Sequence, residues 1–216
     1  HGITRNRLDI FALADALSFA GFATVAIDQP LHGVTDTTSP FYMKGLERTF
    51  DLDLVNNATS AAGPDGKIDP SGRYFVNPGS WLTTRDNFRE AAEDLRQLTA
   101  SLPLVDLDGD QKPDLDIGHI HFVGHSLGAL IGPTFLAIED NVTSATLGMG
   151  SGGFVKFLDA SPTLSPILIA GLAALGYTKG TPDYEFALSV VQTVVDSGDT
   201  INYGAAAASL HPIHLI

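Results

Sequence analysis

The chain has 216 residues, of which 44% are hydrophobic and 17% charged, so it can bury the core of one domain. Twelve basic residues against 25 acidic ones give a formal net charge of −13, which repels nucleic acid backbones and argues against nucleic acid as a partner. The absence of cysteine excludes disulfides, thiolate metal sites and a cysteine nucleophile. The longest apolar run, residues 166–175, is shorter than the roughly 20 residues of a membrane span, so no transmembrane segment is expected.

The first part of the chain predicts a helix, a strand and a long irregular excursion. Apolar residues recur at helical spacing over residues 8–20, and Gly21 follows where a helix commonly ends. Residues 22–27 form a short apolar run typical of a buried strand. From residue 31 to about residue 82, scattered Gly, Pro, Asn and Asp predict loop structure.

The remainder alternates between helical and strand patterns. A second helix is predicted after Thr84 and Asp86, either of which can cap it, and it ends before Pro103. Strands are predicted at residues 117–123, 142–149 and 212–216, with a helix through about residue 138 after the first and helical stretches over residues 154–208. This alternation predicts an α/β fold, a three-layer αβα sandwich with a mostly parallel sheet.

A motif for nucleophilic catalysis lies between the first of these later strands and its helix. Gly124-His125-Ser126-Leu127-Gly128 matches the nucleophile elbow, in which a serine occupies a strained turn and glycines leave room on both sides. A five-residue pattern with three fixed positions also arises by chance in a chain with 22 glycines. The strand before the motif and the helix after it favour the functional interpretation, with Ser126 as a catalytic nucleophile in an α/β-hydrolase fold.

A second signal stands at the start of the chain. In α/β-hydrolases a His-Gly pair follows an early strand, and a nearby backbone N–H helps to bind the oxyanion of the reaction. His1-Gly2-Ile3-Thr4 fits this pattern, although an ordinary turn explains a lone His-Gly pair more often than catalysis does. The N–H groups of Ile3 and Leu127 are therefore the two predicted oxyanion donors.

Five stretches together resemble the extracellular bacterial lipase and lysophospholipase family, also called virulence-factor lipases. They are His1-Gly2-Ile3-Thr4, residues 28–33, Thr84-Arg85-Asp86-Asn87, residues 124–128 and residues 192–197. The resemblance implies hydrolysis of carboxylic esters of fatty acids, Ser126 as nucleophile, Ile3 and Leu127 as oxyanion donors, no required cofactor, and an extracellular or cell-surface location. Lipid esters, rather than small soluble esters, are the favoured substrates.

The rest of the catalytic triad is harder to place. In this fold the acid and then the histidine follow the serine along the chain, each after a later strand. Asp196 or Asp199 with His211 or His214 can complete a triad only if the chain is complete, and these histidines flank or enter a predicted strand. We therefore expect the chain to be clipped at both ends, with the acid and the base beyond residue 216.

An acidic loop is a candidate calcium site. Asp106, Asp108, Asp110 and Asp114 have a spacing that can wrap oxygen ligands round Ca²⁺. Gln111 and Ile117 stand where an EF-hand-like loop has Gly and Glu, so a solvated acidic turn is an equal alternative.

We therefore expect one α/β-hydrolase domain over residues 1–216, with a helical lid-like insertion at about residues 154–208. The expected function is ester hydrolysis through an acyl-enzyme on Ser126. Two alternatives stay open: a non-catalytic hydrolase-like scaffold or binding domain without a complete triad, and an acyltransferase that uses the same serine.

Overall fold

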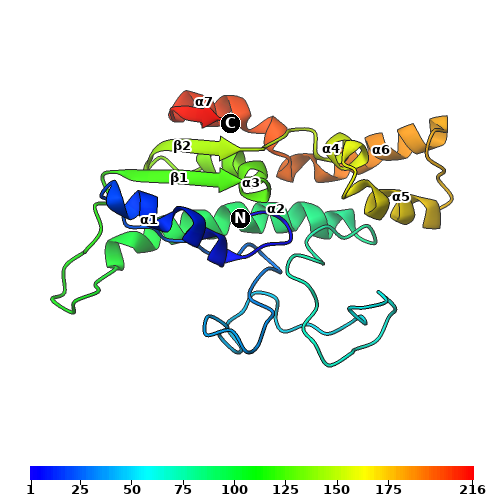
Figure 1. Cartoon of the computed structure of the whole chain (residues 1–216). Coiled ribbons are helices and arrows are strands. Elements are labelled where there is room, and N and C mark those ends of the chain that lie inside the picture. The colour runs from blue at the N-terminus through cyan, green and yellow to red at the C-terminus, as the bar shows by residue number, and fades with distance from the viewer. The chain divides into compact units, whose positions relative to one another are not determined.

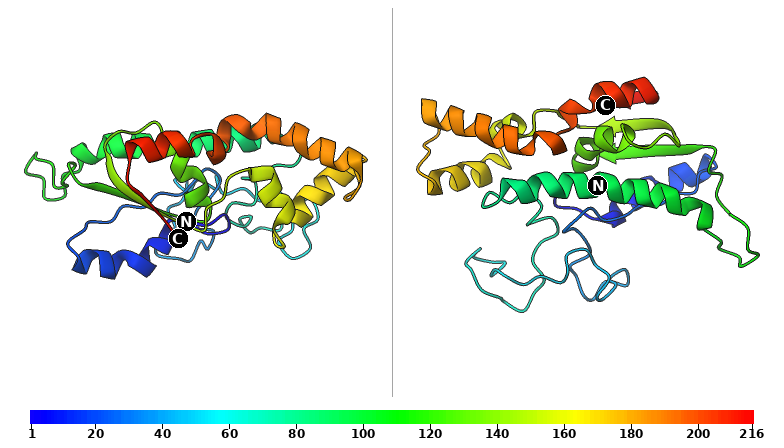
Figure 2. Two further views of the ribbon diagram at one scale, coloured as in Figure 1. Left: turned by 90° about the horizontal axis from the view of Figure 1, so that it is seen from above. Right: turned by 180° about the vertical axis from the view of Figure 1, so that it is seen from behind.

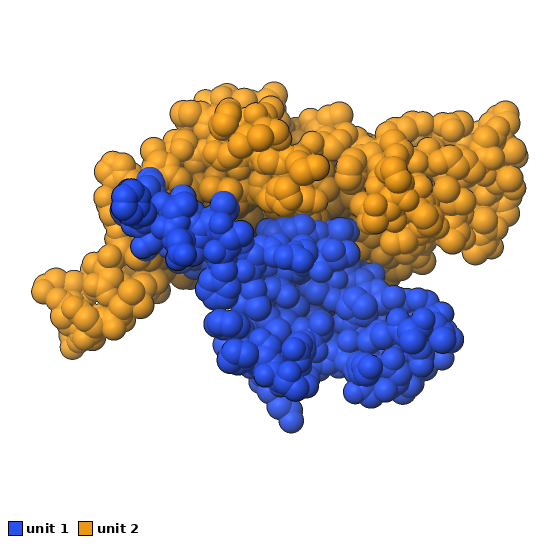
Figure 3. All heavy atoms as spheres, viewed as in Figure 1, with its two compact units in different colours: residues 1–75 blue, residues 76–216 orange.

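The computed structural model describes all 216 residues and contains seven α-helices and three β-strands, joined by long loops and short 3₁₀ helices (Figures 1 and 2). The chain divides into two compact units, residues 1–75 and residues 76–216, which we call unit 1 and unit 2 (Figure 3). Each unit is described by itself. The expectation that residues 1–216 form a single hydrolase domain stays a prediction.

Unit 1 has little regular structure beyond its first helix. The 3₁₀ helix η1 (Arg7–Ile10) leads directly into α1 (Phe11–Phe19), and Gly21 follows with a positive φ of 91°. The Asn6 side chain starts η1 by accepting a hydrogen bond from the Leu8 N–H at 3.0 Å. The predicted helix over residues 8–20 is thus confirmed. The predicted strand over residues 22–27 is wrong, because no segment of unit 1 pairs with it and a lone strand has no hydrogen-bonding partner.

Polar side chains hold the loops of unit 1 in place. The Arg7 guanidinium forms ion pairs with Asp28 and with both carboxylate oxygens of Glu47, the latter at 2.8 Å. Glu47 is buried and also accepts the Val34 N–H at 2.8 Å. Charge-assisted bonds of this kind fix loop backbones that have no sheet to join.

The sheet of unit 2 is small and parallel. Strands β1 (Ile120–His125), β2 (Val142–Gly148) and β3 (Ile213–Leu215) lie in the order β1-β2-β3. Figure 1 shows β1 and β2 side by side and pointing the same way. All three lie at or near the positions predicted from the sequence, and the mixed helix and parallel strand content agrees with the expected α/β class.

Three helices of unit 2 lie beside the sheet. α3 (Leu127–Leu136) packs against β1, where the Phe135 ring lies 5.2 Å from the Phe122 ring. α2 (Trp81–Ser101) and α7 (Gly204–Leu210) both pack against α3, and η2 (Leu102–Leu104) extends the end of α2. Ser80 caps α2, rather than Thr84 or Asp86, by accepting the Thr83 N–H at 3.3 Å.

A helical segment follows β2, as expected for residues 154–208. It contains α4 (Phe154–Ala160), α5 (Ser165–Ala174), α6 (Pro182–Val195), and the 3₁₀ helices η3 (Asp196–Gly198) and η4 (Thr200–Asn202). The Phe154 ring packs edge-on against Phe88 of α2, with ring centroids 4.7 Å apart. None of the helices alone has both the length and the apolar composition of a membrane span, and α4 with α5 reaches them only as a pair bent by 102°.

Candidate active site at the end of β1

Ser126 occupies the sharp turn between β1 and α3. Its backbone has φ 52° and ψ −111°, a sparsely populated conformation that costs about 1–3 kcal/mol in a non-glycine residue. The turn is tied to the next strand, because the Ser126 N–H donates to the Gly148 carbonyl oxygen at 2.8 Å. The Ser126 side chain does not cap α3, and its Oγ takes part in no hydrogen bond, so the hydroxyl is available to a reacting group.

Gly124 is required by the packing of this turn. A Cβ at position 124 would lie 2.5 Å from the carbonyl oxygen of Gly128 and 3.0 Å from the amide nitrogen of Ala129, both backbone atoms. No side chain can avoid such contacts without moving β1 away from α3. The sequence argument that glycine lets strand and helix approach closely is confirmed at position 124.

Two backbone donors lie beside the serine. The N–H groups of Leu127 and Gly128 open α3, where a helix has no carbonyl of its own to offer them, and neither donates to any protein acceptor. Both belong to the positive end of the helix. The Leu127 N–H is thus free to donate, and its role as oxyanion donor stays a prediction. The Gly128 N–H is free as well, and the sequence did not single it out although the first N–H groups of every helix lack an intrahelical acceptor.

The other predicted donor, Ile3, lies in unit 1. Its N–H is also without a protein acceptor, and the segment before it is anchored, because His1 Nε2 accepts the Gln29 N–H at 3.0 Å. The His32 ring nitrogens lie 2.6 Å from the Ile3 carbonyl oxygen and 2.8 Å from the Pro30 carbonyl oxygen. Since Ile3 and Leu127 belong to different units, their joint action on one oxyanion stays a prediction.

The arrangement in which His211 or His214 acts as base is excluded by the geometry of unit 2. His211 is buried, and its ring nitrogens lie 2.7 Å from the Val142 carbonyl oxygen and 2.9 Å from the Leu136 carbonyl oxygen. Val142 begins β2, whereas Ser126 bonds to Gly148 at its end, about 20 Å away by the rise per residue of a strand. His214 lies within β3 opposite Thr146, so neither ring is beside Ser126.

Asp199 stabilises loop backbone and is not placed as the acid of a catalytic triad. It is buried and accepts the backbone N–H groups of Gly153, Phe154 and Ile201 at 3.2, 2.6 and 3.0 Å, as well as the Gln192 Nε2 at 2.8 Å. These bonds hold the start of α4 and of η4. No histidine is among its partners, so the triad that sequence spacing allowed for Asp199 is not formed.

The remaining histidines do not supply a base either. His1 and His32 have both ring nitrogens engaged with backbone groups of unit 1. His119 Nδ1 lies 2.7 Å from Asp116, and His121 Nδ1 lies 2.8 Å from the Ser144 hydroxyl. His125 precedes Ser126 on β1, and no carboxylate holds its ring. None of these histidines therefore completes a catalytic triad with Ser126.

The acidic loop brings three of its four predicted ligands together. Ligand oxygens of Asp106, Asp108 and Asp114 lie within 4.8 Å of one another, a spread that fits oxygens about 2.4 Å from a shared Ca²⁺. Asp110 is not in this group, and its carboxylate binds the Lys112 ammonium at 2.7 Å. All three grouped side chains are exposed, so solvent competes for them.

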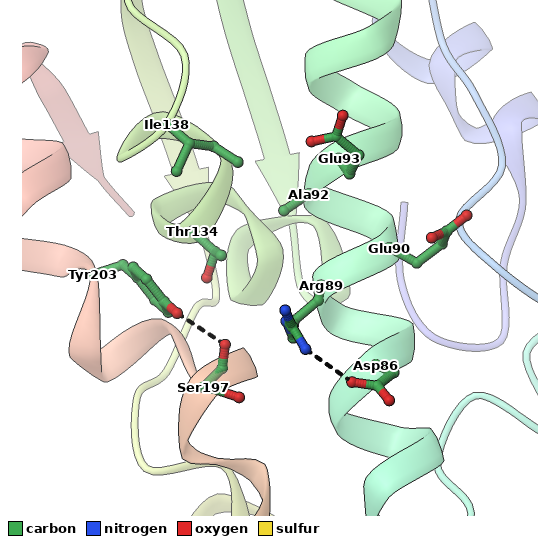
Figure 4. A pocket seen from close by; sticks show the side chains of 9 residues that line it. All are labelled: Asp86, Arg89, Glu90, Ala92, Glu93, Thr134, Ile138, Ser197 and Tyr203. Carbon is green, nitrogen blue, oxygen red and sulfur yellow. Dashed lines mark hydrogen bonds and ion pairs between the residues drawn. The ribbon is translucent and has the colours of Figure 1, made fainter.

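Two cavities of unit 2 lie outside the elbow itself. One, of ≈ 370 Å³, is at the carboxyl ends of β2 and β3 and is lined mainly by Ala129, Pro133, Leu147, Gly150, Ile201 and Leu215. The other, of ≈ 490 Å³, lies between α2 and η3 (Figure 4). Its Arg89 pairs with Asp86 at 3.3 Å, and its Tyr203 hydroxyl donates to the Ser197 carbonyl oxygen at 2.8 Å. No histidine is among the residues that line the second cavity.

Comparison with known proteins finds no match for the chain. No protein-family model matches it. Neither the curated proteins nor the solved structures contain a match. The assignment of a chemical role therefore rests on the geometry around Ser126.

Proposed function

We propose that the chain carries the nucleophile of a serine ester hydrolase of the lipase and esterase kind, built on an α/β-hydrolase fold. The observation that carries the proposal is the Ser126 turn, with its positive φ, its unbonded hydroxyl and two free N–H groups directly after it. The resemblance to extracellular bacterial lipases points to the same chemistry.

In the proposed reaction the Ser126 hydroxyl is the nucleophile and the free N–H groups after it stabilise the oxyanion. Ser126 Oγ attacks the ester carbonyl carbon, its proton passes to a general base, and the carbonyl oxygen becomes an oxyanion. The N–H groups of Leu127 and Gly128 donate to that oxyanion, with Ile3 as the proposed donor from unit 1. The carbon–oxygen bond to the alcohol breaks, the alcohol leaves with the proton, and water then hydrolyses the acyl-enzyme.

The proposed reaction also needs a general base that accepts the Ser126 proton. Because each histidine other than His125 is engaged elsewhere or lies away from Ser126, we propose that the base and its acid reach Ser126 from outside these 216 residues. No cofactor enters this chemistry. A lipid-like acyl group is favoured by the apolar lining of the ≈ 370 Å³ cavity and by the uncharged stretch between Asp159 and Lys179, which includes α5.

Release of fatty acid from a series of carboxylic esters tests the proposal, using the protein isolated from its natural source and two variants. Ser126→Ala should abolish release. Ser189→Ala removes another serine hydroxyl, exposed on α6 and outside the lining of both cavities, and it should leave release unchanged. Loss of activity in both variants, or in neither, would contradict the assignment of Ser126.

The two alternatives make different predictions. A non-catalytic scaffold is supported by the lack of a placed histidine, and it predicts no turnover of any ester. An acyltransferase predicts that added alcohol or thiol, rather than water, receives the acyl group. Analysis of products in the presence of a competing alcohol separates hydrolysis from transfer.

A further inference from the structure

Unit 1 contains an acidic loop, residues 51–69, in which buried oxygens are left without partners. Six buried side-chain polar atoms in the structure have no hydrogen-bond partner, and three of them, Asp51 Oδ1, Asn57 Oδ1 and Asp69 Oδ1, belong to this loop. All three are acceptors only. The Asn57 amide is oriented by its Nδ2, which donates to the Ile68 carbonyl oxygen at 3.0 Å. Buried acceptors of this kind call for a donor or a cation.

Asp69 is the clearest of the three. It is 2% exposed, and its Oδ2 accepts the Leu54 N–H at 2.7 Å and the Tyr74 hydroxyl at 2.6 Å, while its Oδ1 accepts nothing. Burial and the hydrogen bond to this carboxylate raise the pKa of Tyr74 to about 12, so the phenol stays a neutral donor. No ion pair of unit 1 includes Asp69. A buried carboxylate without a cation is unfavourable.

The loop brings the Asn57 side chain against the backbone next to Asp69. Asn57 bonds to the carbonyl of Ile68, the residue before Asp69, and the Asp69 N–H donates to the Leu52 carbonyl oxygen at 2.7 Å. The loop carries four aspartates and a single lysine, Lys67. Its interior is therefore lined by oxygens in a negative field.

We propose that this loop binds a divalent cation, with Ca²⁺ the best match, through Asp69 Oδ1 and Asn57 Oδ1. Ca²⁺ takes six to eight oxygens from carboxylates, amide carbonyls and water in flexible geometry, whereas Mg²⁺ demands a near-ideal octahedron. The competing occupant is one buried water, which can donate a hydrogen bond to each of the two oxygens. This cation site uses residues of unit 1 only, whereas the Ser126 elbow and the group of Asp106, Asp108 and Asp114 belong to unit 2.

Terbium luminescence offers a direct test, because Tb³⁺ replaces Ca²⁺ and emits when a nearby tyrosine is excited. The whole chain carrying Asp108→Asn, which weakens the exposed acidic group of unit 2, serves as the parent. We expect saturable emission that Ca²⁺ displaces. Asp69→Asn in this parent should weaken binding at least about tenfold, since it removes the charged ligand. Asp36→Asn, at an exposed aspartate of unit 1, should leave binding unchanged.

The unfolding temperature serves as a second measurement, which distinguishes loss of cation binding from loss of folding. Ca²⁺ should raise the unfolding temperature of the parent and of Tyr74→Phe, but Tyr74→Phe should emit less terbium light because the tyrosine bonded to Asp69 is gone and only Tyr42, bonded to Asp51, still contacts the loop. Equal emission from the parent and Asp69→Asn would overturn the proposal, as would absence of binding, which leaves water as the occupant. Emission that is unaffected by Tyr74→Phe would overturn it as well, by placing the cation elsewhere.

Discussion

The amide nitrogen of Ser126 and the carbonyl oxygen of Gly148 lie 2.8 Å apart, which joins the turn after β1 to the last residue of β2. This bond continues the parallel pairing of the two strands, in which His125 is opposite Gly148. It holds the strained serine at the carboxyl edge of the sheet, where ligands of open α/β sheets bind. The position of Ser126 thus depends on the neighbouring strand as well as on its own turn.

Replacement of Gly124 by alanine should destabilise unit 2. The added Cβ meets backbone atoms of α3 at 2.5 Å, and such overpacking costs about 1–3 kcal/mol or more. Gly204→Ala is the control, because a Cβ at position 204 meets nothing within 4 Å and should change stability by less than about 1 kcal/mol. Denaturant unfolding measures both, and an unchanged free energy of unfolding in Gly124→Ala would refute the close approach of β1 and α3.

Asp199 should prove structural rather than catalytic. Asp199→Ala leaves three backbone N–H groups without their acceptor, at a cost of about 2–4 kcal/mol in the free energy of unfolding. Asp196→Ala removes a carboxylate that accepts only Gln192 Nε2, and it should cost much less. The more conservative Asp199→Asn should leave the reaction of Ser126 with esters intact. A loss of that reaction in a folded Asp199→Asn protein would return Asp199 to the list of candidate acids.

Unit 1 should lose stability when the pH falls. Burial lowers the pKa of His32 below its ordinary value of 6.5, so the unfolded chain binds a proton more readily than the folded one. The sign follows from linkage: the stability linked to His32 is fully present above about pH 6.5 and is lost as the pH falls through the lowered pKa. Hydrogen exchange of unit 1 between pH 7.5 and pH 5, with His32→Gln as the reference, measures this loss. A wild-type profile parallel to that of His32→Gln would contradict it.

The acidic group of unit 2 should bind Ca²⁺ weakly, with a Kd on the order of 10⁻⁴–10⁻³ M, the range of low-affinity calcium sites. Asp108→Asn should weaken this binding, because Asp108 belongs to the group of three carboxylates. Asp110→Asn should not, since Asp110 is bound to Lys112. Calorimetry of each variant in an Asp69→Asn background separates this site from the one proposed in unit 1. Equal losses in Asp108→Asn and Asp110→Asn would contradict the three-ligand geometry.

The sequence predicted the parts of the fold whose cause is local. The parallel strands β1 and β2, the turn at Ser126 and the helix α3 follow from apolar runs and from glycine spacing, and the structure has them within a few residues of the predicted positions. The strand predicted at residues 22–27 is not formed, because a strand exists only where another chain segment pairs with it. The sequence of residues 22–27 does not indicate whether such a pairing segment exists.

Only the contiguous part of the candidate site could be predicted from the sequence. Ser126, Gly124 and Leu127 could be identified because the elbow is a contiguous motif. The roles of Asp199 and His211 depend on contacts between residues 45 to 75 positions apart, which sequence spacing does not reveal. The unpaired oxygens of Asn57 and Asp69 are likewise visible only once burial is known.

The central claim is that Ser126 is a catalytic nucleophile whose base lies outside these residues, and its most direct test is covalent labelling by a fluorophosphonate. The protein from its natural source should be labelled at Ser126, and Ser126→Ala should not be labelled there, whereas Ser189→Ala, at an exposed serine of α6, should be labelled like the parent. The 216-residue chain alone should react on the order of 10³-fold more slowly or worse, because no base activates its serine. Labelling at another serine, or none at Ser126 in the natural protein, would contradict the claim, and rapid labelling of the 216-residue chain would show that the base lies within it.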